Sequence, residues 1–146
     1  KSAKNSRLEL YGKVILYSSI LISISMLSYS TIKQSRVWKD SITLWSHEIS
    51  VDPTFPEPYH RRGNAYRVKG YYHEALDDLT MAISLNPFTV PDYYNDRGIV
   101  YTKLKNFPEA VNDFNLAISL DTANPMYKNN RDTALREFEY TSKFIK

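Results

Sequence analysis

Apolar, small and aromatic positions recur along the chain with a period of 35 residues. Twelve residues between Pro56 and Leu85 are identical to the residue 35 positions further on. They are Pro56, Tyr59, Arg62, Gly63, Tyr66, Glu74, Ala75, Asp78, Ala82, Ile83, Ser84 and Leu85, matched by Pro91, Tyr94, Arg97, Gly98, Tyr101, Glu109, Ala110, Asp113, Ala117, Ile118, Ser119 and Leu120. A period in the thirties is typical of stacked helical repeats. A chance pair of amphipathic helices would not recur in register.

Within each repeat the apolar positions have helical spacing and predict two helices. At Gly63 and Ala82 we expect the two helix backbones to approach closely, with Tyr66 and Leu79 filling the space beside them. Pro87 cannot continue a helix and should end the second one. The helices are predicted near residues 57–69, 73–85, 92–104 and 108–120.

Two shorter patterns flank the repeats. Residues 37–53 fit half a repeat, a second helix whose apolar positions Ile42, Trp45 and Ile49 would cover the first full repeat. Pro125 to Phe144 predicts a final amphipathic helix. In our alignment Tyr127 takes the aromatic position, Arg131 the glycine position and Ala134 that of the second tyrosine, which favours a solvating cap over a third repeat. Its outer side would carry Lys128, Arg131, Glu139 and Lys143.

Residues 14–32, VILYSSILISISMLSYSTI, contain no charged residue. Nineteen helical residues span about 28 Å, close to the thickness of a bilayer core. The serines can bond to carbonyls of the preceding turn, and aromatic residues lie near both ends. Three interpretations stay open, a membrane-spanning helix, a buried first helix of the repeat array and a cleaved signal segment, of which we favour the first. Four basic residues precede the segment and three follow, which weakly favours an extracytoplasmic location for the repeats.

Charge and composition narrow the functional classes. The net charge of +3 divides into +6 over residues 1–39, with seven Lys/Arg and one acid, and −3 over residues 40–146, with twelve Lys/Arg and fifteen acids. Because the repeats are mildly acidic, we expect no nucleic-acid partner. The chain contains no cysteine, which excludes disulfides and thiol nucleophiles. The spacing of the three histidines does not predict a metal site, and we expect no cofactor and no catalytic residue.

The spacing of Tyr59, Gly63 and Tyr66, followed by Ala75, Leu79, Ala82 and Pro87, resembles the tetratricopeptide repeat. This resemblance implies an all-α, right-handed helix-turn-helix solenoid of about two full repeats, a half repeat and a capping helix. It also implies that the first helix of each repeat lines a concave groove that binds a protein or peptide. The groove residues would be Glu57, His60, Arg61, Asn64, Arg67 and Val68 from the first repeat and Asp92, Asn95, Asp96, Ile99, Thr102 and Lys103 from the second.

Some family members clamp a peptide's terminal carboxylate in this groove with paired Lys and Asn side chains. His60 and Asn64 match part of that pattern, but Asp96 puts an acid where the family has an amide. We therefore expect no such clamp. Separately, Arg62 and Asp78 are sixteen residues apart, as are Arg97 and Asp113. This spacing predicts an Arg–Asp bridge between the two helices of each repeat, with a ligand-binding role as the alternative.

The junction before the repeats is similar to another family, the transmembrane-and-tetratricopeptide O-mannosyltransferase-like proteins. Trp38, Lys39, Asp40, Leu44 and Trp45 carry this similarity. It implies that the chain is the accessory region of a membrane glycosyltransferase that positions an acceptor protein, with the catalytic part outside this chain.

We therefore predict a membrane-anchored scaffold for protein–protein interaction, with the glycosyltransferase accessory region as the alternative and a purely structural cap on a membrane bundle as a third option. Its predicted organisation is a basic flank (1–13), a transmembrane helix (14–35), a partial repeat (36–55), two tetratricopeptide repeats (56–89 and 90–123) and a capping helix (124–146).

Overall fold

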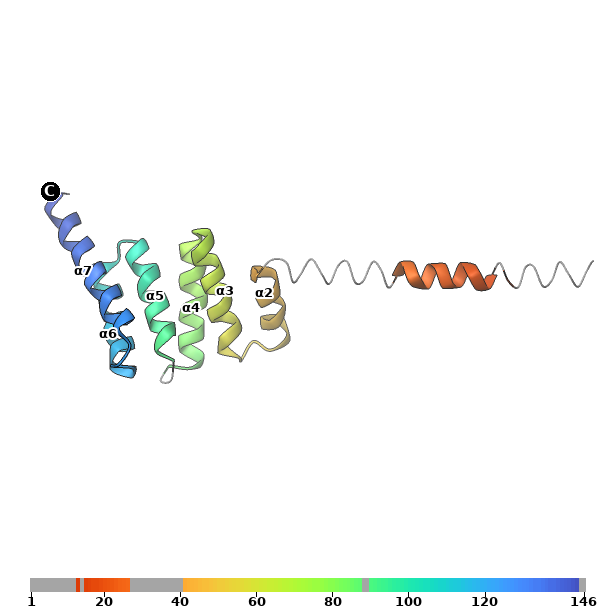
Figure 1. The fold of residues 1–146 in the computed structure, drawn as a ribbon, viewed down its shortest axis with the longest axis horizontal. Coiled ribbons are helices and arrows are strands. Elements are labelled where there is room, and N and C mark those ends of the chain that lie inside the picture. The colour runs from red at the N-terminus through yellow and green to blue at the C-terminus, as the bar shows by residue number, and fades with distance from the viewer. Residues whose placement is uncertain (1–12, 14, 27–40, 88–89, 145–146) are drawn as a thin grey trace, which may run out of the picture. The chain divides into compact units, whose positions relative to one another are not determined.

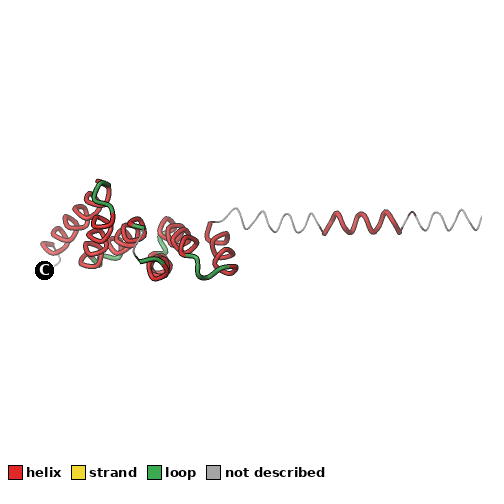
Figure 2. The backbone as a smooth tube through the Cα atoms, turned by 90° about the horizontal axis from the view of Figure 1, so that it is seen from below, coloured by secondary structure: helices red, strands yellow, loops and turns green. Residues whose placement is uncertain are grey.

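The computed structural model describes residues 13, 15–26, 41–87 and 90–144, and every regular element in these ranges is a helix. The chain divides into two compact units, residues 1–40 and 41–146. The second unit contains α2 (Ser41–Val51), α3 (Pro56–Lys69), α4 (Tyr72–Leu85), α5 (Pro91–Lys103), α6 (Phe107–Leu120) and α7 (Pro125–Phe144). In Figure 1 these helices stand in a row in chain order, and Figure 2 shows the short loops between them. The four repeat helices predicted from the sequence are confirmed.

The first unit is described only at Lys13 and over the helical residues 15–26. The serine hydroxyls bond to carbonyls of the preceding turn, as expected, for example Ser23 Oγ to the carbonyl of Ser19 at 2.9 Å. No helix among the described residues is long and apolar enough to cross a membrane. The remainder of the predicted span, at residue 14 and residues 27–35, lies outside the described residues, as does the basic flank apart from Lys13.

From α2 to α7 each helix packs against its chain neighbours, and α5 also contacts α3 and α7. The core lies along the row in three groups of buried apolar side chains. They are Ala75, Leu79 and Val100, then Ala82, Ile83, Tyr93, Tyr94, Ala117 and Tyr127, then Ala110, Phe114 and Ala134. Because each group draws on consecutive helices, side chains of neighbouring repeats are buried against one another.

Glycine permits the close approach of the two helices in each repeat. A Cβ atom placed on Gly63 would lie 2.9 Å from Leu79 Cγ and 3.3 Å from the carbonyl oxygen of Ala75. The predicted approach at Gly63 is therefore confirmed, with Ala75 as its backbone neighbour. Ala82 is fully buried in the group that contains Tyr93 and Tyr94 of α5, against which Tyr59 of α3 also packs.

The predicted Arg–Asp bridges are confirmed, and both are bidentate. Arg62 donates from Nε and Nη2 to Asp78 at 2.7 Å each, and Arg97 donates to Asp113 at 2.7 and 2.8 Å. Each guanidinium also lies about 6 Å from two tyrosine rings of its own helix, for example 5.9 and 5.8 Å for Arg97 over Tyr94 and Tyr101. The two bridges join the helices of each repeat.

α2 supports the first full repeat, as predicted. It packs on α3, and its apolar residues Ile42, Trp45 and Ile49 are half-buried. Ser46 accepts a hydrogen bond from Arg62 Nη1 at 3.0 Å. The part of the predicted partial repeat that precedes Ser41 lies outside the described residues.

The alignment predicted for α7 is wrong by one position. Arg131 Nη1 reaches back to Asn115 at 3.3 Å, just as Arg97 Nη1 reaches Thr80 at 3.4 Å. Arg131 therefore takes the arginine position, and Asp132 stands where the earlier repeats have glycine. α7 therefore has the register of the first helix of a repeat. Asp132 stands at the position where the earlier first helices approach the second helix of their repeat.

Candidate binding groove

The candidate groove is formed by the first helices α3, α5 and α7, which are joined side by side by hydrogen bonds between their side chains. Tyr93 of α5 donates its hydroxyl to Glu57 of α3 at 3.0 Å, and Tyr127 of α7 donates to Asp92 of α5 at 2.8 Å. Burial and the acceptor carboxylate raise the pKa of each tyrosine to about 12. Both phenols therefore keep the proton that they donate, and the same contact repeats from one unit to the next.

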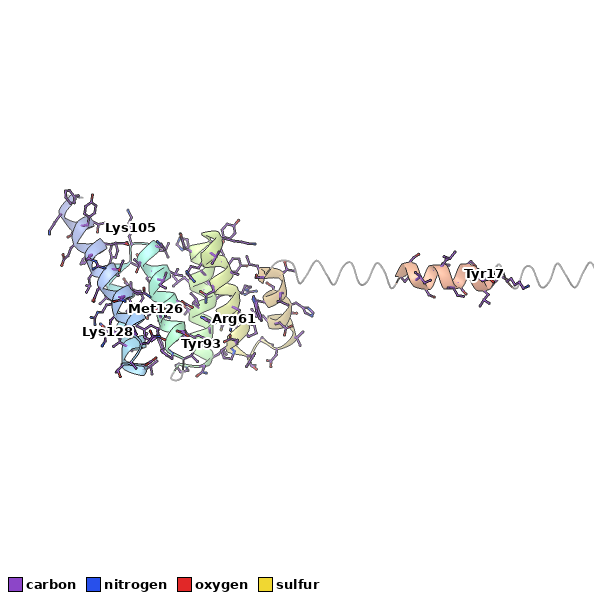
Figure 3. The ribbon with its side chains drawn as sticks, in the orientation of Figure 1. Tyr17, Arg61, Tyr93, Lys105, Met126 and Lys128 are labelled. Atoms are coloured by element: carbon purple, nitrogen blue, oxygen red, sulfur yellow. The ribbon has the colours of Figure 1, made fainter. Side chains whose placement is uncertain are left out.

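Glu57 is shared between two donors at one end of this surface. Besides the phenol of Tyr93 it accepts Arg61 Nε at 2.6 Å. Burial opposes ionisation of Glu57, but these two hydrogen bonds outweigh burial and lower its pKa. Figure 3 shows Arg61 on α3 with Tyr93 nearby on α5. The carboxylate is thus ionised and largely committed to the fold.

A second network lies at the centre of the surface. Asp96 Oδ2 lies 2.8 Å from His60 Nε2 and 2.7 Å from the amide nitrogen of Asn64. Arg67 donates to Asn64 Oδ1 at 3.0 Å, which fixes the orientation of that amide. Burial raises the pKa of Asp96, but the bonds from His60 and Asn64 outweigh burial, so the pKa lies below its usual value. The carboxylate is ionised, and a second carboxylate placed here would be repelled.

One ring nitrogen of His60 has no hydrogen-bond partner in this network. Because Asp96 accepts at Nε2, that nitrogen carries a proton, and the ring stacks at a tilt on Tyr93 with 4.6 Å between centroids. The other nitrogen, Nδ1, is buried without a hydrogen-bond partner among the described residues. His60 and Asn64, which match part of the family's clamp pattern, therefore lie close together, but both contact the carboxylate of Asp96.

The structure places the predicted groove residues at different depths. Arg61, Val68, Asp92 and Lys103 are exposed; Glu57, His60, Asn64, Arg67, Asp96, Ile99 and Thr102 are half-buried; Asn95 is buried. Asn95 accepts a hydrogen bond from Asn130 of α7 at 2.8 Å, and Ile99 packs against the buried group that contains Phe114. These two side chains hold α5 against its neighbours, whereas the four exposed residues are accessible to a partner.

Sequence reasoning missed Tyr93, Tyr127 and Asn130. The signal was present in the spacing, because Tyr93 and Tyr127 are 34 residues apart and their acceptors Glu57 and Asp92 are 35 apart. In the described part of the chain, no group of three His, Asp or Glu side chains could hold a metal ion.

Comparisons with known proteins agree with the repeat assignment. Residues 56–88 and residues 91–124 each match a family model described as tetratricopeptide repeat. Each of the two segments is therefore a tetratricopeptide repeat, as the sequence pattern indicated. No curated protein sequence matches the chain.

Several solved structures share the fold. The Sgt2 TPR domain from Aspergillus fumigatus is 18% identical, with a TM-score of 0.66 over 80% of this chain and 80% of that one. The first TPR of Spaghetti (RPAP3), bound to the HSP90 peptide SRMEEVD, is 21% identical, with a TM-score of 0.65 over 73% of this chain and 88% of that one. The second TPR domain of human RPAP3, in complex with the HSP70 peptide SGPTIEEVD, is 23% identical, with a TM-score of 0.62 over 71% of this chain and 90% of that one.

Proposed function

We propose that these two tetratricopeptide repeats are a non-enzymatic scaffold that binds an extended peptide segment of a partner protein along α3, α5 and α7. The observation that carries this proposal is the set of hydrogen bonds that joins the three first helices and holds side chains of neighbouring repeats in place. Side chains fixed in this way lose little entropy when a partner binds. The complexes of two structural neighbours with HSP90 and HSP70 peptides support the same use of the fold.

The partner's chemistry must differ from that of those neighbours' peptides at the centre of the groove. Asp96 is an ionised acid between His60 and Asn64, so a carboxylate at this point would meet repulsion. A backbone amide or a cationic side chain of the partner fits better, because Asp96 accepts hydrogen bonds.

A peptide selection with a matched pair of variants tests the proposal. Peptides would be selected from a random library on the full chain in mild detergent, and their affinities measured by fluorescence anisotropy. Val68 on α3 and Met81 on α4 are both exposed apolar residues of the first repeat, with 79% and 44% exposure. We expect Val68→Arg to weaken the selected peptides about tenfold, because a long charged side chain would obstruct the groove, and Met81→Arg to leave their affinity unchanged.

Equal effects of the two substitutions, or a loss only with Met81→Arg, would place the binding surface elsewhere. Failure to select any peptide that binds below about 1 mM would count against peptide binding itself.

We further propose that residues 14–32 anchor the scaffold in a membrane, with the repeats on the extracytoplasmic side. The uncharged run with basic residues on both sides supports this proposal, and so does the division of the chain into separate units at residue 40. The similarity of the junction to O-mannosyltransferase-like proteins supports the alternative of a glycosyltransferase accessory region. Of the residues that carry this similarity, Trp38, Lys39 and Asp40 lie outside the described residues. The sequence that precedes Lys1 in the parent protein would distinguish the two proposals.

Deletion of residues 1–35 tests the anchor. The truncated chain should stay in solution without detergent and unfold cooperatively on heating, because residues 41–146 form a compact unit with their own core. The full chain should float with liposomes in a density gradient and the truncated chain should not. A full chain that stays monomeric in buffer without detergent would contradict the anchor, as would a truncated chain that has lost its cooperative transition.

A further inference from the structure

A cavity of about 370 Å³ opens where α5 ends and α7 passes over the start of α6. Its apolar part is formed by Phe107, which is 4% exposed, and by Tyr140, which is 66% exposed. Its charged side chains are Lys103, Lys105, Arg136 and one acid, Glu137. The volume is in the range of small-ligand sites, and the cavity combines an aromatic surface with an excess of two positive charges.

The two lysines of the cavity form no ion pairs within the described part of the chain. Neither Lys103 nor Lys105 forms an ion pair with any residue in the described part of the chain, whereas the arginines at the repeat arginine positions all do. Among the described residues, Arg136 bonds only to the neighbouring Thr133 hydroxyl, at 3.1 Å. The positive charge of this cavity is therefore available to a ligand.

Lys105 holds its place at a conformational cost. α3 ends in a turn in which Gly70 N–H bonds to the carbonyl of Arg67 at 3.1 Å and Tyr71 N–H to that of Tyr66 at 3.0 Å, with Gly70 at φ 82°. The turn after α5 repeats this pattern, since Lys105 N–H bonds to Thr102 at 3.0 Å and Asn106 N–H to Tyr101 at 2.9 Å. The residue in the left-handed conformation is now Lys105, at φ 63°. Glycine is the residue that this position favours.

A left-handed lysine in a turn that elsewhere has glycine suggests that its side chain serves a function, because such conformations cluster at binding sites. We propose that this cavity binds an acidic side chain of the partner peptide, with an adjacent apolar side chain of the peptide on Phe107 and Tyr140. The inference rests on the proposed peptide-binding function. The proposed site places the partner's negative charge at the C-terminal end of α5. It lies away from the acidic part of the groove at Asp96.

The probes are two fluorescein-labelled peptides with blocked ends, Gly-Ser-Phe-Glu-Glu-Val-Ser-Gly and a neutral twin with both Glu replaced by Gln. Affinity for the full chain in mild detergent would be measured by fluorescence anisotropy at two salt concentrations. We expect the acidic peptide to bind about tenfold more tightly than its twin, with the difference shrinking at high salt. Lys103→Ala should weaken the acidic peptide about three- to tenfold. Lys128→Ala should have no effect, because Lys128 lies on α7 outside the cavity (Figure 3).

Lys105 provides a test that separates binding from folding. Lys105→Gly and Lys105→Ala both remove the charge and should both weaken the acidic peptide. Only Lys105→Gly relieves the left-handed conformation, so it alone should raise the melting temperature, by about 2–5 °C. A variant that is more stable and yet binds less tightly cannot have lost affinity through misfolding.

Equal affinity for the two peptides would overturn the inference, and so would wild-type affinity in both the Lys103 and Lys105 variants. Absence of binding of either peptide at about 1 mM would overturn it as well. If library-selected peptides still depend on Val68 while charge has no effect, the groove proposal stands and this cavity is not its acidic subsite.

Discussion

Replacing Arg97 by alanine should destabilise the repeat unit by about 3–5 kcal/mol, because Asp113 would keep its charge in a buried site without its partner. The carboxylate is only 1% exposed, and its two oxygens accept Arg97 Nε and Nη2 at 2.7 and 2.8 Å. Urea unfolding of the full chain at pH 7, followed by circular dichroism, measures the loss. A double-mutant cycle with Asp113→Ala should show a coupling of about 0.5–3 kcal/mol.

The same arginine position in α7 provides the matched control. Arg131 pairs with Asp132 at 3.0 Å, but the two side chains are 31% and 52% exposed. An exposed pair contributes at most about 1 kcal/mol, so Arg131→Ala should have a small effect. Equal losses for Arg97→Ala and Arg131→Ala would mean that the buried carboxylate is not the cause.

Acid should reduce the cost of Arg97→Ala. Burial raises the pKa of Asp113 even with Arg97 beside it, and removal of Arg97 must raise this pKa further. A carboxyl whose pKa is raised in the folded state destabilises the folded state at pH values above that pKa, where it is ionised. This destabilisation disappears as the pH falls and the carboxyl becomes protonated. The difference between wild type and variant should therefore narrow as the pH falls from 7 to about 5. A difference that stays constant or widens over this range would contradict the assignment.

The sequence predicted the helices and the bridges because both repeat. A single amphipathic pattern could have arisen by chance, but Arg62 and Arg97 each have an aspartate sixteen residues later in a repeat of known period. The residue sixteen positions after each arginine lies on the second helix of the same repeat, at the level of the arginine. The repeat register therefore predicts that the two side chains meet. The structure confirms both pairs.

The sequence was less informative where identity between repeats is lost. In α7 neither the glycine nor the second tyrosine of the repeat pattern is kept at its position, so the alignment rested on Tyr127 alone. Tyr127 matches Tyr93 and not Tyr94, as its hydrogen bond to Asp92 shows. Because Tyr93 and Tyr94 are adjacent in α5, the sequence did not show which of them Tyr127 matches. The hydrogen bond that decides this joins two repeats, so it could not be read from one repeat alone.

The candidate groove was predictable as a surface and not as a chemical site. Helical spacing placed His60, Asn64 and Asp96 on the first helices, but it could not show that they bond to one another. It also could not show that Asn95 is buried beneath a bond from Asn130, because burial there depends on how α7 packs. The cavity at Lys105 was visible in the alignment only as a lysine opposite Gly70, and its significance depends on the backbone conformation.

Replacing Gly98 by leucine should cost about 2–4 kcal/mol, because α5 and α6 could no longer pack at their present distance. A Cβ atom on Gly98 would lie 2.8 Å from Phe114 Cε1 and 3.0 Å from Cδ1 and Cζ. Phe114 is 1% exposed and packs with Ala110 and Ala134, so its ring has no free space to move into. The backbone must therefore separate, and urea unfolding would measure the loss.

Val68→Leu is the control for added volume, because Val68 is 79% exposed and an exposed apolar exchange should change the free energy of unfolding by less than about 0.5 kcal/mol. Ile99→Ala should show a distinct loss, because Ile99 packs against the buried group of Ala110, Phe114 and Ala134. Phe114→Leu should recover part of the loss caused by Gly98→Leu, since the smaller side chain makes room for the new one. If the two substitutions were simply additive, contact between position 98 and the Phe114 ring could not be what sets the distance between α5 and α6.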